Sequence, residues 1–165
     1  MPRRHAQRCE MDPDRLSTRL DLSFPGRLEA IPPIVDRIMG VVREEGCAAG
    51  SEFEIEVALD EALANAVKHG CRFNAEKSIH VSVLCEADRG LLLIVRDPGD
   101  GFELTAIPSP VVGERVFASH GRGIFLINRL MDEVHYTKGG TEIWMRKSRR
   151  PSRSPARRRE TSRRG

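Results

Sequence analysis

The chain has 165 residues, of which 39% are hydrophobic and 31% charged, a composition typical of a globular protein that folds as one domain. No apolar run is long enough to cross a bilayer, and the polar N-terminal sequence MPRRHAQRCEMDPDR lacks the apolar segment of a secretory signal, which favours a cytoplasmic location. The net charge is +3, and residues 148–165 alone carry +7, which leaves a mildly acidic −4 for residues 1–147.

The first elements follow a polar N-terminal tail over residues 1–17. Residues 18–24, TRLDLSF, alternate polar and apolar side chains, as a half-buried strand does. Residues 28–45 repeat apolar side chains at spacings of three and four. This pattern predicts an amphipathic helix that Gly46 ends.

A second helix and a hairpin are predicted next. Ser51 and Glu54 form a capping-box pattern, which predicts a helix over residues 52–68. Alternation around residues 79–83, followed by the aliphatic run at residues 91–95, predicts two antiparallel strands, the second more deeply buried.

The last part of the domain combines a loop, a helix and a hairpin. Residues 102–119 are rich in proline and lack a steady period, so we expect a surface loop there. The sequence GIFLINRLM from residue 123 has a helical pattern, and EVHYT, KGG and TEIWMR predict a closing hairpin.

This order of elements predicts the fold class. Strands that follow helices and form neighbouring hairpins indicate a mixed, largely antiparallel sheet covered on one face by three helices. We therefore expect a two-layer α/β sandwich over residues 18–147. Residues 148–165 contain eight arginines and too few apolar residues to bury, so this tail is expected to be disordered. It either solubilises the chain or holds nucleic acid or an acidic partner.

Four cysteines, Cys9, Cys47, Cys71 and Cys85, are widely spaced and form no CxxC pair. In a cytoplasmic protein this spacing indicates reduced, structural thiols rather than a zinc site.

The second predicted helix carries the first candidate site. Glu61 and Asn65 lie four residues apart, with Lys68 and His69 continuing the same stripe. A carboxylate can accept a proton from an attacking hydroxyl, and an amide oxygen suits Mg²⁺. The alternative is a solvated polar helix face, which the spacing alone favours.

The sequence VRDPGDGFEL contains the second candidate site. Asp97 follows the buried strand, where its carboxylate can accept a hydrogen bond from an exocyclic amine. Gly99 and Gly101 permit backbone angles that other residues avoid. A tight turn with a capping aspartate is the alternative, and it explains one glycine better than two.

The sequence SHGRGIFLINRL contains the third candidate site. Gly121 and Gly123 precede a helix whose free amides can hold phosphate, and Arg122 adds positive charge. The stretch is neither a Walker A loop nor a dinucleotide fingerprint, and a plain helix start is its alternative. Together the three sites describe a nucleotide pocket.

The motifs DEALANAVKHG, VRDPGDGF and HGRGIFLINRLMDEV resemble the N, G1 and G2 boxes of the ATPase superfamily that includes gyrase, the Hsp90 chaperone, histidine kinases and mismatch-repair ATPases. Within this superfamily the chain resembles the single-domain anti-sigma factor serine-protein kinases of bacteria. The resemblance covers residues 18–147 and implies the Bergerat ATP-binding fold with a histidine-kinase-like ATPase domain.

The resemblance also implies roles for individual residues. Glu61 corresponds to the base that prepares the acceptor hydroxyl, Asn65 to the Mg²⁺ ligand and Asp97 to the residue that reads the adenine amine. Residues 105–119 correspond to the lid. The nucleotide-binding set implied in this way is Asn65, Lys68, His69, Asp97, Gly99, Gly101, His120, Gly121, Arg122, Gly123 and Ile124.

The implied cofactors are ATP and Mg²⁺, and the implied partners are a small anti-sigma-factor antagonist, phosphorylated on serine, and a sigma factor. Members of this family are usually homodimers. Two alternatives stay open: a module that binds ATP and sequesters a partner without phosphoryl transfer, and a nucleic-acid-associated ATPase that uses the arginine-rich tail.

Overall fold

The computed structural model describes residues 17–86, 89–101 and 121–149. The predicted loop over residues 102–119 and nearly all of both predicted tails lie outside these ranges.

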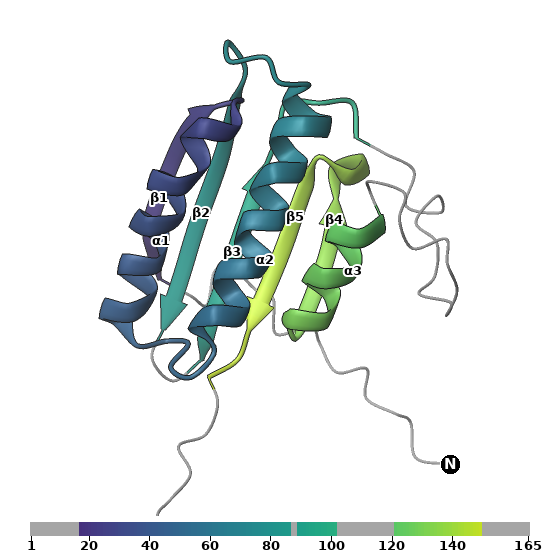
Figure 1. Cartoon of the computed structure of the whole chain (residues 1–165). Coiled ribbons are helices and arrows are strands. Elements are labelled where there is room, and N and C mark those ends of the chain that lie inside the picture. The colour runs from purple at the N-terminus through teal and green to yellow at the C-terminus, as the bar shows by residue number, and fades with distance from the viewer. Residues whose placement is uncertain (1–16, 87–88, 102–120, 150–165) are drawn as a thin grey trace, which may run out of the picture.

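A five-stranded sheet forms one layer of the domain (Figure 1). Its order is β1-β2-β3-β5-β4, and each of the four neighbouring pairs is antiparallel. Both predicted hairpins are confirmed, β2 with β3 and β4 with β5. The strands are β1 (Thr18–Pro25), β2 (Ser78–Glu86), β3 (Gly90–Arg96), β4 (Glu133–Thr137) and β5 (Glu142–Lys147).

In the described ranges, three α-helices form the second layer, and they cover one face of the sheet (Figure 1). The predicted two-layer α/β sandwich is therefore confirmed. The helices are α1 (Ile31–Glu45), α2 (Glu52–Asn65) and α3 (Gly121–Leu130), and the short helical segments are η2 (Leu28–Ala30), η3 (Ala66–Cys71) and η5 (Lys138–Gly140). In the described part of the chain, none of the helices combines the length and apolarity that a membrane crossing requires.

The boundaries of α1 follow from its sequence. The predicted helix over residues 28–45 begins with the 3₁₀ turn η2, and Pro32 lies in the first turn of α1, where a missing N–H costs nothing. At the other end Gly46 adopts a left-handed conformation with φ of 63°, and its N–H donates to the Val42 carbonyl at 3.1 Å.

Helix α2 begins at Glu52, as predicted, but the predicted capping box between Ser51 and Glu54 does not form. Ser51 is the N-cap residue, yet its side chain makes no capping hydrogen bond. Glu54 instead forms an ion pair with the buried Lys147, with 2.7 Å between Oε2 and Nζ. The glutamate therefore ties α2 to β5 rather than closing its own helix.

The core lies between the two layers. Its fully buried side chains come from the inner faces of α1 and α2 and from alternate positions of the strands, which is the burial that their sequence periods predict. They include Ile38, Met39, Ile55, Leu59, Leu63, Ile79, Leu91, Leu93 and Met145.

The expectation of reduced thiols is wrong for two of the cysteines. Cys47, after α1, and Cys85, in β2, are joined by a disulfide. Sequence spacing could not reveal this pair, because the two residues are separated by 38 positions and meet only when the helical layer packs on the sheet. Cys71 is free and buried, and Cys9 lies outside the described residues.

Candidate functional site

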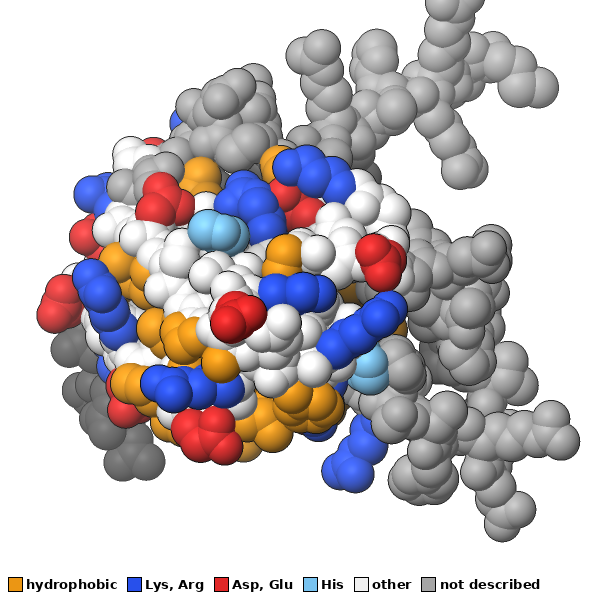
Figure 2. All heavy atoms as spheres, turned by 90° about the horizontal axis from the view of Figure 1, so that it is seen from above, with side chains coloured by type: hydrophobic (Ala, Val, Ile, Leu, Met, Phe, Trp, Pro, Cys, Tyr) orange, Lys and Arg blue, Asp and Glu red, His pale blue; other side chains and the backbone are white. Residues whose placement is uncertain are grey.

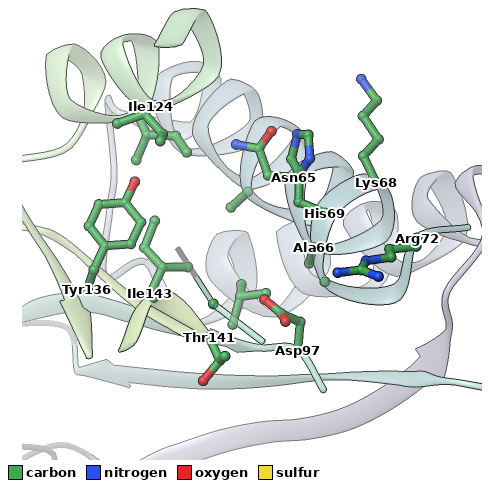
Figure 3. A pocket seen from close by; sticks show the side chains of 16 residues that line it. Asn65, Ala66, Lys68, His69, Arg72, Asp97, Ile124, Tyr136, Thr141 and Ile143 are labelled. Atoms are coloured by element: carbon green, nitrogen blue, oxygen red, sulfur yellow. The ribbon is translucent and has the colours of Figure 1, made fainter. Parts of the chain in front are cut away.

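A cavity of about 300 Å³ opens between the end of α2, helix α3 and the sheet. Figure 3 shows that Asn65 and His69 reach it from the α2 side, Ile124 from α3, and Asp97, Tyr136, Thr141 and Ile143 from the sheet. The lining residues are Ala62, Asn65, Ala66, Lys68, His69, Gly70, Arg72, Val95, Asp97, Gly101, Ile124, Ile127, Tyr136, Gly140, Thr141 and Ile143.

The cavity brings together residues from all three predicted sites. Those in its lining are Asn65, Lys68, His69, Asp97, Gly101 and Ile124. Predicted residues outside the lining are Glu61, Gly99, Gly121, Arg122 and Gly123. Arg122 is exposed on α3, and His120 lies outside the described residues.

Asp97 directly follows the end of β3, where hydrogen bonds of its backbone and of the next turn hold it in place. Its N–H donates to the Thr141 carbonyl at 2.9 Å, and its Oδ1 accepts the Gly99 N–H at 2.8 Å. Burial raises the pKa of Asp97, while the Gly99 hydrogen bond and Lys77 act in the opposite direction. The carboxylate is therefore a fixed acceptor in a partly desolvated place.

Two glycines make room around this carboxylate and the following turn. A Cβ at Gly70 would overlap the Asp97 carboxyl group. Gly101 has φ of 77°, and a Cβ there would overlap the carbonyl of Gly139. The close approach that the two glycines of VRDPGDGF suggested is thus present at both: a Cβ at Gly99 would overlap the backbone of Gly70, and the Gly99 N–H also binds Asp97.

The polar stripe of α2 faces the first turn of α3. A Cβ at Gly123 would lie 2.8 Å from Glu61 Oε2 and 3.1 Å from Asn65 Nδ2. This close approach brings the first turn of α3 next to a carboxylate and an amide. Asn65 therefore lines one end of the cavity, with Glu61 and Gly123 beside it, and Asp97 lines the other end.

Apolar side chains line the space between these two ends. Val95, Ile127 and Ile143 are buried core residues that also reach the cavity. Tyr136 stands beside them, and burial raises its pKa to about 12, so the phenol stays neutral. A flat aromatic ring with polar edges fits such a slot, because its faces lose water while its edges keep hydrogen bonds.

Several lining residues were missed by sequence reasoning: Gly70, Arg72, Tyr136, Thr141 and Ile143. Gly70 lies in η3, a π-helix, and Arg72 is the C-cap residue that follows it. Both lie beyond residue 68, where the predicted second helix ends. Arg72 adopts φ of 53°, and its guanidinium binds Asp100 at 3.2 Å. The other three reach the site only because β5 pairs with β3.

The donor set of the site suits a metal that is held mainly by phosphate and water. Within the described residues, no group of three or more His, Cys, Asp and Glu side chains could hold a metal ion. Asn65 offers a neutral amide oxygen next to the start of α3, and Glu61 stands close by. Mg²⁺ characteristically takes one or two protein oxygens and keeps its remaining positions for phosphates and waters, so these residues fit Mg²⁺.

Charges of both signs surround this end of the molecule. Figure 2 shows Lys, Arg, Asp and Glu side chains interspersed on the face seen from above, with no large patch of one sign on its coloured part. In the described part of the chain this face does not resemble a nucleic-acid surface, which requires a continuous basic patch.

Comparison with known proteins agrees with this geometry. A family model described as "Histidine kinase-like ATPase domain" matches residues 24–147. The serine-protein kinase RsbW of Staphylococcus epidermidis is 30% identical over 135 residues, which span 76% of this chain and 84% of the relative. The serine-protein kinase RsbW of Staphylococcus aureus strain MSSA476 is 28% identical over 136 residues, which span 78% and 85%.

Proposed function

Because the chain belongs to the histidine kinase-like ATPase domain family, and within it to the serine-protein kinases of the anti-sigma factor type, we propose that it phosphorylates a serine of an anti-sigma-factor antagonist. The observation that carries this proposal is the single cavity that joins Asn65 to Asp97, with Gly123 packed against Glu61 and Asn65.

The proposed site binds adenine at the end that Asp97 lines. The Asp97 carboxylate accepts a hydrogen bond from the 6-amino group, and Val95 and Ile143 cover the faces of the base. The fixed position of Asp97 between the Thr141 carbonyl and the Gly99 N–H supports this role, because a preset acceptor loses little entropy on binding.

The phosphates extend toward the start of α3, whose free N–H groups and positive dipole end favour negative charge. Asn65 would hold Mg²⁺ there, and a bound ion would supply positive charge to neutralise the phosphate oxygens. Gly123 supports this arrangement, since it lets the first turn of α3 pack close to Asn65 and Glu61.

Glu61 is proposed as the base. The substrate serine oxygen attacks the γ-phosphorus, the bond from that phosphorus to the β,γ-bridging oxygen breaks, and ADP leaves. The serine proton passes to the Glu61 carboxylate, which stands within reach of the start of α3. Most of the rate gain in such a reaction comes from positioning and charge neutralisation, so a single compact domain is sufficient.

The partners are part of the proposal. The resemblance of the three motifs to anti-sigma factor kinases supports an antagonist protein, a sigma factor, a homodimer and a cytoplasmic location. The two staphylococcal relatives are serine-protein kinases, which supports the serine-kinase activity. Light scattering of the purified chain tests the dimer, and a mass of one chain at micromolar concentration would contradict it.

Transfer of labelled phosphate tests the proposal most sharply. With Mg²⁺, labelled ATP and a purified candidate antagonist, we expect label on one antagonist serine and none after that serine is changed to alanine. Glu61→Gln should lower transfer by about 100-fold or more while ATP binding persists. Asp60→Asn, the neighbouring acid on α2, is the control and should retain transfer.

ATP binding without transfer to any antagonist would support the sequestering module instead.

A further inference from the structure

Glu142 carries a buried carboxylate on the face of the sheet opposite the helices, where its side chain is 5% exposed. Its neighbour Ile143 belongs to the core between the layers, so strand alternation places Glu142 on the other face, together with Trp144. The residues on either side of it, Thr141 and Ile143, line the cavity. The carboxylate thus lies directly behind the site.

Four donors from separate segments meet at this carboxylate. Arg96 Nε of β3 and Trp144 Nε1 of β5 each lie 2.6 Å from it. Thr137 Oγ1 of β4 lies at 3.0 Å, and Lys138 Nζ of η5 at 3.1 Å. A buried carboxylate with several charged and neutral donors is well satisfied, and it fixes the geometry of every segment that supplies one.

One of these segments is a strained turn. Lys138, Gly139 and Gly140 have φ of 51°, 68° and 92°, so three consecutive residues are left-handed. This conformation is unfavourable for a lysine and persists only where surrounding contacts enforce it. The bonds from Thr137 and Lys138 to Glu142 supply such contacts at the start of the turn.

The same turn forms the wall behind Asp97. The carbonyl of Gly139 packs against Gly101, and Gly140 lines the cavity. Thr141 then accepts the Asp97 N–H at 2.9 Å. On the other side of Asp97, the preceding residue Arg96 binds Glu142 directly. Glu142 therefore holds Asp97 by two routes, through the turn and through β3.

We propose that Glu142 is a positioning residue for nucleotide recognition, which sets the Asp97 carboxylate against the 6-amino group of adenine. This inference rests on the proposed function, because it requires that the cavity bind adenine nucleotides. Glu142 does not touch the nucleotide. Its loss should affect recognition of the amino group more than binding of the rest of the molecule.

Calorimetry with two nucleotides separates positioning from general damage. The probes are ATP and purine riboside 5′-triphosphate, which lacks only the 6-amino group, both with Mg²⁺. In Glu142→Gln we expect the Kd for ATP to rise about 5- to 10-fold and that for the purine analogue to change less than about 2-fold. Glu133→Gln is the matched control, since Glu133 binds Arg146 at 3.0 Å on the same face of the sheet, and both affinities should persist.

A second variant covers the case in which Glu142→Gln does not fold. Lys138→Met cuts one route to the turn at a side chain that is 68% exposed, and it should reduce the preference for ATP in the same direction, by about 2- to 3-fold. Trp144, the only tryptophan of the chain, adds a spectroscopic readout. ATP should change its emission in the wild-type protein and change it less in Lys138→Met.

The outcomes distinguish the two proposals. A wild-type chain that takes up no ATP would overturn the proposed function and the role of Glu142 with it. A wild-type chain that prefers ATP, with an equal preference in Glu142→Gln and Lys138→Met, would overturn the positioning role alone. An equal loss of affinity for both nucleotides would also overturn it.

Discussion

At the residue scale, the proposed recognition of adenine depends on Asp97. Its Oδ1 accepts the Gly99 N–H at 2.8 Å, which leaves the rest of the carboxylate to face the cavity. Burial raises its pKa, so water competes less for this acceptor than at an exposed aspartate. An amide in its place would present the same shape without the charge.

Asp97→Asn should therefore weaken ATP binding by about 10-fold or more, because a hydrogen bond to a charged acceptor contributes about 1.5–3 kcal/mol. Calorimetry with ATP and Mg²⁺ measures the change. Asp21→Asn, an exposed aspartate of β1, serves as control and should bind ATP like the wild type. Equal affinity of Asp97→Asn and the control would contradict the role of Asp97.

A substitution at Gly70 tests the position of the Asp97 carboxylate without changing Asp97 itself. In Gly70→Ala the new methyl group would overlap the Asp97 carboxyl group, so ATP affinity should fall along with stability. Gly40→Ala is the matched control, because a Cβ there meets nothing within 4 Å and α1 should gain up to about 1 kcal/mol. Nucleotide titrations and urea unfolding of both variants decide this prediction, and unchanged affinity in Gly70→Ala would refute it.

At the scale of elements, the sequence predicted the strands and helices well but missed how α2 ends. The period of apolar residues located both hairpins and all three helices. It placed the end of the second helix at residue 68, whereas α2 ends at Asn65 and continues as the π-helix η3. No side-chain pattern marks that change, and it turns His69, Gly70 and Arg72 toward the cavity.

Lys147 joins three elements at the opposite end of the sheet from Asp97. Its side chain is 7% exposed, and its ammonium binds Glu54 of α2 at 2.7 Å and donates to the Leu130 carbonyl of α3 at 2.5 Å. Asp132 lies further away, at 3.6 Å. One buried cation therefore fixes both helices that flank the site to the sheet.

Lys147→Met should lower the free energy of unfolding by about 3 kcal/mol. The reason is that the Glu54 carboxylate and the Leu130 carbonyl would both lose the ammonium that binds them. Arg43→Met is the comparison, since Arg43 binds Glu56 at the surface, and its loss should cost less than about 1 kcal/mol. Urea unfolding monitored by circular dichroism measures both. Similar small losses in the two variants would argue against the clamp.

At the scale of the whole molecule, the stability of the fold should depend on the ionised state of Glu142. Burial alone would raise its pKa, but the hydrogen bonds from Trp144, Lys138, Thr137 and Arg96 outweigh burial and lower the pKa from 4.5 to about 2. A carboxylate whose pKa is lowered by folding stabilises the folded state above its unfolded pKa and loses that contribution as the pH falls.

The free energy of unfolding of the wild-type protein should therefore decrease between about pH 4.5 and 2 more steeply than that of Glu142→Gln, which has no proton to bind at this position. Denaturant titrations at a series of pH values measure the two slopes. Parallel curves over this range would show that Glu142 is not the group responsible.

The three motifs were predictable because each is local, and their arrangement was not. Asn65, Asp97 and Gly101 carry recognisable chemistry in sequence, and all three line the cavity. Thr141 and Glu142 carry no such signal. Thr141 lines the cavity and Glu142 lies behind it because β5 pairs not only with β4, its neighbour in sequence, but also with the distant β3. Strand order depends on contacts between distant residues, which periodicity does not report.

A crystal structure with a non-hydrolysable ATP analogue and Mg²⁺ tests the central claim most directly. We expect the 6-amino group within hydrogen-bonding distance of the Asp97 carboxylate, and the metal and phosphates beside Asn65 and the start of α3. A nucleotide bound with its phosphates toward Asp97, or bound elsewhere on the molecule, would contradict the account.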